Sequence, residues 1–274
     1  MIFYKTDEEI ELMRLSNLLV SQTHAHVAAM IRPGITGAEL DQEAETFIRD
    51  HGAVPAFKGY NGFPATLCIS INEQVVHGIP SRQEFKEGDV ISLDCGVQHN
   101  DFFGDSAFTY AIGDPGEEVM RLLRVTNTSL YVGIEQAVAG NRLGDIGFAI
   151  QEYVERQHGF GVVRELVGHG IGRHLHEEPE VPNYGKRGRG IMLKEGLVIA
   201  IEPMVNRGKK AVKQAADGWT VISRDGTTSA HFEHSIAIRK GKADILSDHS
   251  IIETVVQKNP NLMEIGILSE AFSA

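Results

Sequence analysis

Hydrophobic and polar residues follow two different periods along this chain, and the helical period marks four segments. Two of these segments open with a capping box, Thr6-x-x-Glu9 and Thr36-x-x-Glu39, in which a threonine and a glutamate satisfy the free N–H groups of a helix start. Pro33, Gly34 and Gly52 supply the matching stop signals. We therefore expect helices over residues 6–30, 36–52, 116–139 and 143–158.

The remaining apolar runs are short and rich in β-branched residues, which is typical of strands. We expect strands over residues 66–71, 90–97, 101–112, 197–205, 219–223 and 227–239. Turn residues at His99-Asn100 and at Arg224-Asp225-Gly226 predict two hairpins. Each half of the chain then contains two helices followed by antiparallel strands. Helices packed on one face of a curved antiparallel sheet make an α+β fold.

The two halves also resemble each other in sequence. Residues 85–94 read FKEGDVISLD, and residues 193–202 read LKEGLVIAIE, about 108 positions later. This match places Asp94 opposite Glu202, and a looser match places Asp105 opposite Glu233. Two copies are too few for a solenoid, so we expect a duplicated half-domain folded around a pseudo-two-fold axis. The pseudo-repeats cover about 6–112 and 115–240 within one domain of residues 1–245, followed by an extension over 246–274.

Composition excludes several classes of protein. The formal net charge is −11, which argues against nonspecific nucleic-acid binding. The acidic start of the chain lacks the apolar stretch of a signal peptide, and no apolar run is long enough to span a membrane. Two cysteines, Cys68 and Cys95, form no disulfide framework, so a cytoplasmic location is expected.

Four acidic side chains and one histidine lie within or against apolar, strand-like runs: Asp94, Asp105, His169, Glu202 and Glu233. Buried carboxylates need a partner, and no lysine or arginine lies within three positions of any of the four. Two divalent cations would balance four carboxylates, and a neutral imidazole would complete the ligand set. Oxygen-rich ligation with one histidine suits Mn, Fe(II), Co or Zn.

Paired metal ions acidify a shared water to a hydroxide nucleophile and polarise a carbonyl, which predicts metal-assisted hydrolysis, most simply of an amide. His77 and His176 are candidates for stabilising the oxyanion that develops. For a single histidine the ordinary interpretation is a structural imidazole, but the VHGI around His77 echoes the GHGI around His169. Cys95, next to Asp94, is expected to face the core.

Other motifs leave alternatives open. Residues 168–172, GHGIG, lack the GK[ST] ending of a phosphate-binding loop, so that interpretation fails. The cluster HLHEE at 174–178 is expected to be a polar loop rather than a second metal site. Two basic segments are either solvated loops or docking sites for a polyanion. The first contains Arg207, Lys209, Lys210 and Lys213, and the second contains Lys186, Arg187 and Arg189.

Taken together, CISINEQVVHGIP, GDVISLDCG, GHGIGRHLHEEP, IEPMV and DGWTVISRDGTTSAHFEH resemble the type I methionine aminopeptidases of the short bacterial form, over about residues 6–240. The resemblance implies the pita-bread fold of peptidase family M24. It implies that Asp94 chelates one metal ion, that His169 and Glu202 hold the other, and that Asp105 and Glu233 bridge them. Glu202 would also act as general acid and base.

The same resemblance implies that His77 contacts the substrate beside the scissile amide and that His176 stabilises its carbonyl oxygen. The residues at the positions of the family's methionine pocket are Tyr60, Phe63, Cys68, Leu175 and Trp219. Phe63 and Leu175 replace the tyrosine and phenylalanine expected there.

The activity implied is removal of the N-terminal methionine of nascent proteins when the second residue is small. Two alternatives remain: an X-Pro aminopeptidase or prolidase-like hydrolase, and a non-catalytic binding module with the same fold. Nascent peptide N-termini are the expected partners, with a possible contact between the ribosome and the basic segment that contains Lys209. We expect the protein to be a monomer.

Overall fold

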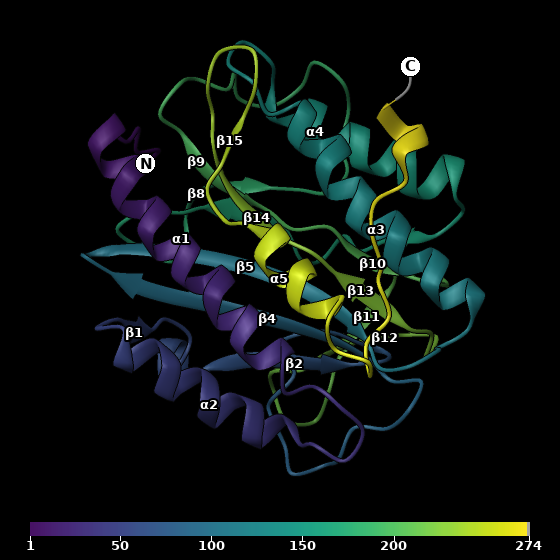
Figure 1. Cartoon of the computed structure of the whole chain (residues 1–274). Helices are drawn as coiled ribbons and strands as arrows, with labels where there is room; N and C mark the ends of the chain where they lie inside the picture. Colours follow the sequence, from purple (N-terminus) through teal and green to yellow (C-terminus); the bar gives the residue numbers. More distant parts are fainter. Residues whose placement is uncertain (273–274) are drawn as a thin grey trace.

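Helices cover one face of a strongly curved antiparallel sheet system in the computed structural model, which describes residues 1–272 (Figure 1). Helices α1 and α3 pack on the strands from the two halves of the chain, and a shorter helix α5 lies between them. The α+β architecture predicted from the sequence is confirmed. The helices are α1 (Asp7–Ala28), α2 (Gly37–Asp50), α3 (Glu117–Glu135), α4 (Leu143–Gln151), which continues as one π-helical stretch (Glu152–Gln157), and α5 (His249–Val256).

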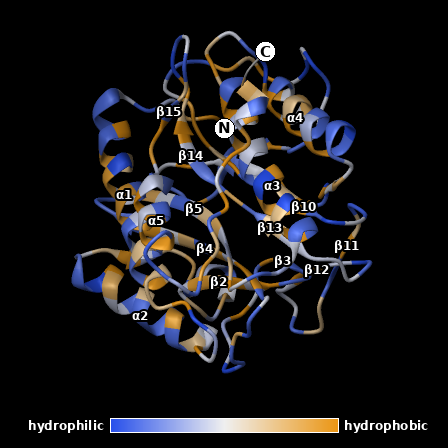
Figure 2. Ribbon diagram, turned by 45° about the vertical axis from the view of Figure 1, so that its right-hand side comes forward, coloured by the Kyte–Doolittle hydropathy of each residue, from blue (hydrophilic) through white to orange (hydrophobic). Residues whose placement is uncertain are grey.

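The first two helices begin at the capping boxes read from the sequence. The hydroxyl of Thr6 accepts a hydrogen bond from the N–H of Glu9 at 3.2 Å, and the Glu9 carboxylate accepts one from the N–H of Thr6 at 3.0 Å. Thr36 and Glu39 form the same pair at the start of α2. Hydrophilic and hydrophobic colours alternate along both helices in Figure 2, as expected of helices with one buried face.

Four antiparallel sheets form the layer beneath the helices. One contains β1 (Val54–Pro55), β2 (Leu67–Ile71), β4 (Val90–His99) and β5 (Phe102–Ala111). A second contains β7 (Gly168–Gly170), β8 (Glu177–Val181), β9 (Val198–Ile201), β14 (His234–Ala237) and β15 (Asp244–Ile245). The two smaller sheets contain β6 (Gly161–Val162), β10 (Met204–Asn206) and β13 (Ser229–His231), and β3 (Gln74–Val76), β11 (Val212–Gln214) and β12 (Val221–Ser223).

The hairpin of β4 and β5 is the longest strand pair of the first half. Its turn lies at Asn100 and Asp101, one residue later than predicted, and both residues have positive φ, 52° and 65°. Two consecutive left-handed residues are the signature of a type I′ turn, whose twist matches that of the strands. The register then pairs Asp94 with Ala107 and Gly96 with Asp105, which brings both acids to the same region of the sheet.

Two strands predicted as continuous are interrupted, so that part of the prediction is wrong. The run 197–205 divides into β9 and β10, and the run 227–239 divides into β13 and β14. Strand β9 pairs with β14 in one sheet, whereas β10 pairs with β13 in another. The breaks fall at Glu202-Pro203 and Phe232-Glu233. Proline lacks an N–H for the ladder, which explains the first break, and each break places a predicted metal ligand where two sheets meet.

The hairpin predicted across residues 224–226 is also wrong. Residues 223–226 do form a turn, but the strand before it, β12, pairs with β11 and with β3 from the first half of the chain. The strand after the turn, β13, pairs with β10. Long-range pairing between the halves therefore replaces the local hairpin.

The sequence did not decide whether the C-terminal extension is a packed helix or a mobile segment. In the structure, residues 246–272 form a packed segment. Residues 273–274 of the predicted extension lie outside the described part of the chain. Helix α5 packs against α1, and its Ile252 is fully buried. The amide of Asn259 donates to the carbonyl oxygens of Ala28 and Ile31 at 2.9 and 2.8 Å, which satisfies acceptors at the end of α1. The predicted domain boundary at residue 245 stays a prediction. Within the described chain, no helix combines the length and apolarity needed to cross a membrane.

Candidate metal centre and substrate cavity

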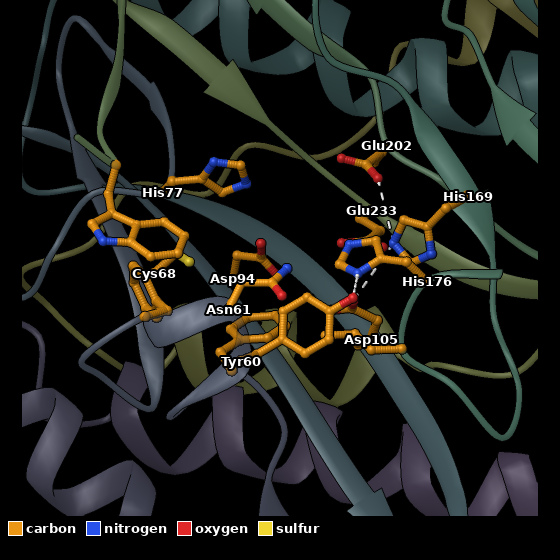
Figure 3. Close-up of a pocket in the computed structure, with 14 residues that line it drawn as sticks. Tyr60, Asn61, Cys68, His77, Asp94, Asp105, His169, His176, Glu202 and Glu233 are labelled. Carbon is orange, nitrogen blue, oxygen red and sulfur yellow. Dashed lines mark hydrogen bonds and ion pairs between the residues drawn. The ribbon is translucent and has the colours of Figure 1, made fainter. Parts of the chain in front are cut away.

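A cavity of about 200 Å³ opens where the two large sheets meet, and every site residue predicted from the sequence lines it (Figure 3). The predicted residues that line it are Tyr60, Phe63, Cys68, His77, Asp94, Asp105, His169, Leu175, His176, Glu202, Trp219 and Glu233. Predicted residues that lie up to 173 positions apart in the chain, from Tyr60 to Glu233, therefore line the same cavity. Their convergence is a finding of the structure, whereas the role of each residue stays a prediction.

Asp94 and Asp105 come from the adjacent strands β4 and β5, and both halves of the chain hold Asp105 in place. Its N–H donates to the side-chain oxygen of Asn17 on α1 at 3.2 Å, and the Ser235 hydroxyl on β14 donates to its carbonyl oxygen at 2.9 Å. The backbone of Asp105 is therefore fixed where the two halves of the chain meet. Asp105 is only 3 % exposed.

Glu202 and Glu233 occupy the two strand breaks described above. The carbonyl oxygen of Glu202 accepts a hydrogen bond from the Asn183 amide at 2.9 Å. Glu233 is attached to β5 twice: its N–H donates to the carbonyl oxygen of Ala107 at 2.9 Å, and the Ser106 hydroxyl donates to its own carbonyl oxygen at 2.7 Å. Glu233 is thus bonded to the strand that carries Asp105.

His169 lies on β7 between two glycines that the packing requires. A Cβ atom on Gly168 would lie 2.3 Å from the carbonyl oxygen of Ala200, and one on Gly170 would lie 2.3 Å from that of Glu178, so neighbouring backbones leave no room for a side chain. The ring Nδ1 of His169 lies 2.9 Å from the carbonyl oxygen of Gly170. Nδ1 therefore carries the proton, and Nε2 presents a lone pair to the cavity.

The Nε2 atom of His169 faces the acidic cluster. It lies 3.8 Å from Oδ2 of Asp105 and 3.7 Å from Oε1 of Glu202. One oxygen of Asp105, one oxygen of Glu233 and a ring nitrogen of His169 all lie within 4.8 Å of one another, which is the spacing of ligands around a single ion.

Burial strongly perturbs the titration of the acidic cluster. Desolvation raises the pKa of Asp94 to about 7 and that of Glu202 to about 8. Desolvation, reinforced by the neighbouring carboxylates, raises the pKa of Asp105 and of Glu233 well above the ordinary range. Burial lowers the pKa of His169 to about 3, which keeps its imidazole neutral. Four neighbouring carboxylates can all be ionised at neutral pH only if positive charge lies beside them. The neutral imidazole of His169 supplies none.

The donor set fits divalent cations. Oδ1 of Asp94, Oδ1 of Asp105 and Oε1 of Glu233 are buried without a hydrogen-bond partner among the described residues. The cavity lining contains no lysine or arginine that could neutralise them. Carboxylate oxygen atoms that line one cavity, together with one imidazole nitrogen, suit Mn, Fe(II), Co or Zn.

His77 and His176 line the same cavity as the acids. His77 adopts a left-handed backbone conformation, with φ of 58°, which is uncommon for a residue other than glycine and clusters at functional sites. His176 follows the glycine-rich segment after His169, and the two rings have centroids 4.3 Å apart. Its Nδ1 lies 2.9 Å from the hydroxyl oxygen of Tyr60. In Figure 3 His77 lies on the side of Cys68, whereas His176 lies next to His169.

An apolar pocket adjoins the acids in the same cavity. Phe63 and Trp219 meet edge to face with ring centroids 5.2 Å apart, and Leu175 is 2 % exposed. Cys68 on β2 is the register partner of Asp94 on β4. Its thiol therefore lies where the apolar pocket adjoins the acidic cluster. Cys95 is fully buried in the main hydrophobic core, as predicted.

Sequence reasoning missed three residues in or beside the cavity. Phe57 and Asn61 line it and flank Tyr60 on the same loop. His231 is 1 % exposed, and its Nε2 lies 3.6 Å from Oε2 of Glu202. A signal for His231 was present: it precedes Glu233 by two positions in a strand-like run, the spacing that puts two side chains on one face of a strand.

Comparison with known proteins identifies the class. The sequence pattern of metallopeptidase family M24 matches residues 11–240, so the chain belongs to this family of metal-dependent peptidases. Among its relatives is a methionine aminopeptidase of Clostridium perfringens, 52% identical over 247 residues, which covers 90% of this chain and 99% of that protein.

Solved structures agree with the sequence comparison. The crystal structure of methionine aminopeptidase from Rickettsia prowazekii matches with a TM-score of 0.89 at 39% identity, covering 90% of this chain and all of that one. The X-Pro aminopeptidase of Thermotoga maritima matches with a TM-score of 0.71 at 22% identity, covering 89% of this chain and 62% of that one. The second likeness shows the pita-bread fold alone, whereas the first and the Clostridium relative place the chain with the methionine aminopeptidases.

Proposed function

We propose that this protein hydrolyses the N-terminal methionine from peptide chains whose second residue is small. The observation that carries this proposal is the shared cavity, in which a pocket suited to an unbranched apolar side chain adjoins four buried acids and a neutral histidine. The similarity to methionine aminopeptidases over nine-tenths of the chain supports it.

Asp94, Asp105, His169, Glu202 and Glu233 would hold two divalent ions. Asp94 would hold one ion, His169 and Glu202 would hold the other, and Asp105 and Glu233 would be shared by both. Bound there, the ions supply Lewis acidity that activates water and polarises the scissile carbonyl.

The protein side chains then orient the substrate and move the protons. Glu202, whose carboxylate lies beside both His169 and His231, is placed to take a proton from the attacking water and to return it to the leaving amine. His77 contacts the substrate beside the amide. His176 donates a hydrogen bond to the carbonyl oxygen as negative charge develops on it.

The apolar pocket would select methionine, and steric exclusion in the rest of the cavity would select the second residue. A hydrophobic pocket discriminates by only about 1–3 kcal/mol per methylene group, so discrimination against bulky second residues must be steric. Phe63 and Leu175 form the wall of the pocket, which is lined by Trp219 and by the soft thiol of Cys68.

Peptide hydrolysis with Mn(II) or Co(II) tests this function. Met-Ala-Ser should be cleaved after methionine, whereas X-Pro peptides and Met-Leu-Ser should remain intact, because the former lack the methionine side chain and the latter has a bulky second residue. Product amino acids are measured by chromatography. Cleavage restricted to X-Pro peptides would instead indicate a prolidase-like hydrolase, and hydrolysis of none with metal bound would indicate a binding module.

The basic segment formed by Arg207, Lys209, Lys210 and Lys213 is proposed to contact the ribosome. All four side chains are exposed, and none forms an ion pair within the described residues. The N–H of Lys209 donates to the Asp225 carboxylate at 2.7 Å, which fixes the loop and presents its cations outward. An ordered cationic loop on a protein of net charge −11 is suited to the phosphate backbone of ribosomal RNA, close to where nascent N-termini emerge.

Charge reversal at Lys209, Lys210 and Lys213 to glutamate is expected to reduce co-sedimentation with ribosomes in a salt-dependent manner, while hydrolysis of Met-Ala-Ser continues. The matched control reverses three exposed lysines elsewhere, Lys86, Lys242 and Lys258, and thus changes the net charge equally. Equal loss of binding in both variants would indicate that only net charge matters and would contradict a specific docking loop.

We further infer that the protein acts as a monomer in a reducing cytoplasm, with one catalytic domain over residues 1–245. Both cysteines, Cys68 and Cys95, are free and buried, which is usual in reducing compartments. A mass in solution equal to that of one 30.1 kDa chain would support the monomer, and a dimer mass would contradict it.

A further inference from the structure

We infer that Tyr60 is a positioning residue, whose hydroxyl group selects the tautomer of His176 that can donate a hydrogen bond to the substrate carbonyl. This inference rests on the proposed function, because it concerns the reaction at that site. It assigns to Tyr60 a task separate from lining the methionine pocket.

The contact between the two side chains is direct. The Tyr60 hydroxyl oxygen lies 2.9 Å from Nδ1 of His176, and the ring centroids lie 5.2 Å apart at an interplanar angle of 36°. Nδ1 of His176 makes no other hydrogen bond within residues 1–272, and Nε2 makes none. In Figure 3 a dashed line joins the Tyr60 hydroxyl to the imidazole of His176.

The chemistry of the two groups decides which one donates. A neutral imidazole has one N–H and one bare nitrogen, and the bare nitrogen is a strong acceptor. The phenolic oxygen is a weaker acceptor, since its lone pair is delocalised into the ring, but its O–H is a good donor. Tyr60 therefore donates to Nδ1, and the proton of the imidazole must reside on Nε2. Nε2–H is then available to the carbonyl oxygen of the substrate.

Both side chains come from segments whose backbones are fixed. The loop of Tyr60 is closed by backbone hydrogen bonds from Gly59 to Phe63 at 2.8 Å and from Phe63 to Tyr60 at 2.9 Å. The segment of His176 is anchored by the next residue, Glu177, whose carboxylate forms a buried ion pair with Lys5 at 2.6 Å. The hydrogen bond thus joins two rigid loops across the mouth of the cavity, which limits rotation of the imidazole.

A role confined to the methionine pocket would give a different kinetic result. Loss of a pocket wall weakens binding of substrate and transition state alike and raises KM, whereas loss of a positioned donor lowers kcat. Tyr60→Phe removes only the hydroxyl and keeps the ring, so it separates the two roles. We expect kcat for Met-Ala-Ser to fall about ten-fold, the lower part of the range for removing an orienting partner, with little change in KM.

A double-mutant cycle gives the decisive test. His176→Ala should lower kcat by about 100-fold, as for removal of one oxyanion donor. If Tyr60 acts through His176, adding Tyr60→Phe to His176→Ala should cause no further loss. The control is Tyr184→Phe, which removes the hydroxyl of a tyrosine outside the cavity and should leave kcat unchanged. Equal ten-fold losses in both backgrounds, or an effect on KM alone, would overturn the inference.

The tautomer itself can be observed without turnover. In zinc-loaded protein with 15N-labelled histidine, the His176 signal, identified by its loss in His176→Ala, should show a bare Nδ1 and a protonated Nε2. In Tyr60→Phe it should shift toward a mixture of tautomers, and an unchanged signal would contradict the inference. If the wild-type protein fails to cleave Met-Ala-Ser, the proposed function fails, but this spectrum still tests the role of Tyr60.

Discussion

Replacement of His169 by alanine is expected to lower kcat/KM for Met-Ala-Ser by at least about 1000-fold, because a bound metal ion stabilises the transition state by several kcal/mol and each 1.4 kcal/mol corresponds to a factor of ten. The hydrogen bond from Nδ1 to the Gly170 carbonyl oxygen aims Nε2 at the cluster. Alanine removes the imidazole nitrogen that is proposed as a ligand and leaves four mutually repelling acids to retain the ions. Metal content per chain should fall in parallel with activity.

The control for this variant is His174→Ala. His174 is exposed and lies in the segment between His169 and His176, but it does not line the cavity. Removal of its side chain should leave metal content and activity unchanged. Circular dichroism establishes that both variants are folded. A His169→Ala protein that keeps its metal and more than a tenth of the wild-type kcat/KM would contradict the assignment of His169 as a ligand.

Local signals predicted much of the fold because each depends on residues close in sequence. The boxes at Thr6 and Thr36 involve contacts three residues apart, and both form as expected. The acids were detectable by a different route: charge within an apolar run needs a partner, whatever the tertiary structure. That argument identified Asp94, Asp105, Glu202 and Glu233 without any knowledge of how the strands pair.

Strand pairing between distant segments could not be predicted in the same way. The run VIAIEPMV has the composition of one strand apart from Pro203, and the different partners of β9 and β10 show that it changes sheets at Glu202. Similarly, the turn at residues 223–226 has a hairpin signature, but β12 finds a better partner in β3. Tyr60 and His176 lie 116 positions apart, and only the tertiary structure brings them together. Their hydrogen bond therefore had no local signal in the sequence.

The C-terminal helix had a local signal that was overlooked. Asp248 caps the start of α5 by accepting from the N–H of Ser250 at 2.9 Å, and Ile252 and Val256 follow at a spacing of four, which puts them on one face of a helix. This spacing, together with the cap at Asp248, favours a packed helix over a mobile extension. We expect the packing of α5 to have a large effect on stability.

Ending the chain after Asp248 is expected to lower the Tm by about 10 °C, because four apolar side chains leave the core and each contributes about 1.5–3 kcal/mol before the entropy cost of ordering the segment is subtracted. The side chains are Ile252, Val256, Leu262 and Ile265, of which the most exposed is 8 % exposed. The truncation also removes two hydrogen bonds from Asn259 to the end of α1 and one contact of 3.1 Å between His249 and the Ser106 hydroxyl. Differential scanning calorimetry measures the change.

A shorter truncation, ending after Leu268, separates this packing from a mere effect of chain length. It removes the final 3₁₀ turn, Ser269–Phe272, none of whose residues is buried, so its Tm should stay close to that of the full chain. Hydrolysis of Met-Ala-Ser well below both melting temperatures should persist even in the longer truncation, because every cavity residue lies between Phe57 and Glu233. An unchanged Tm after removal of residues 249–274 would show that α5 adds nothing to the stability of the core beneath it.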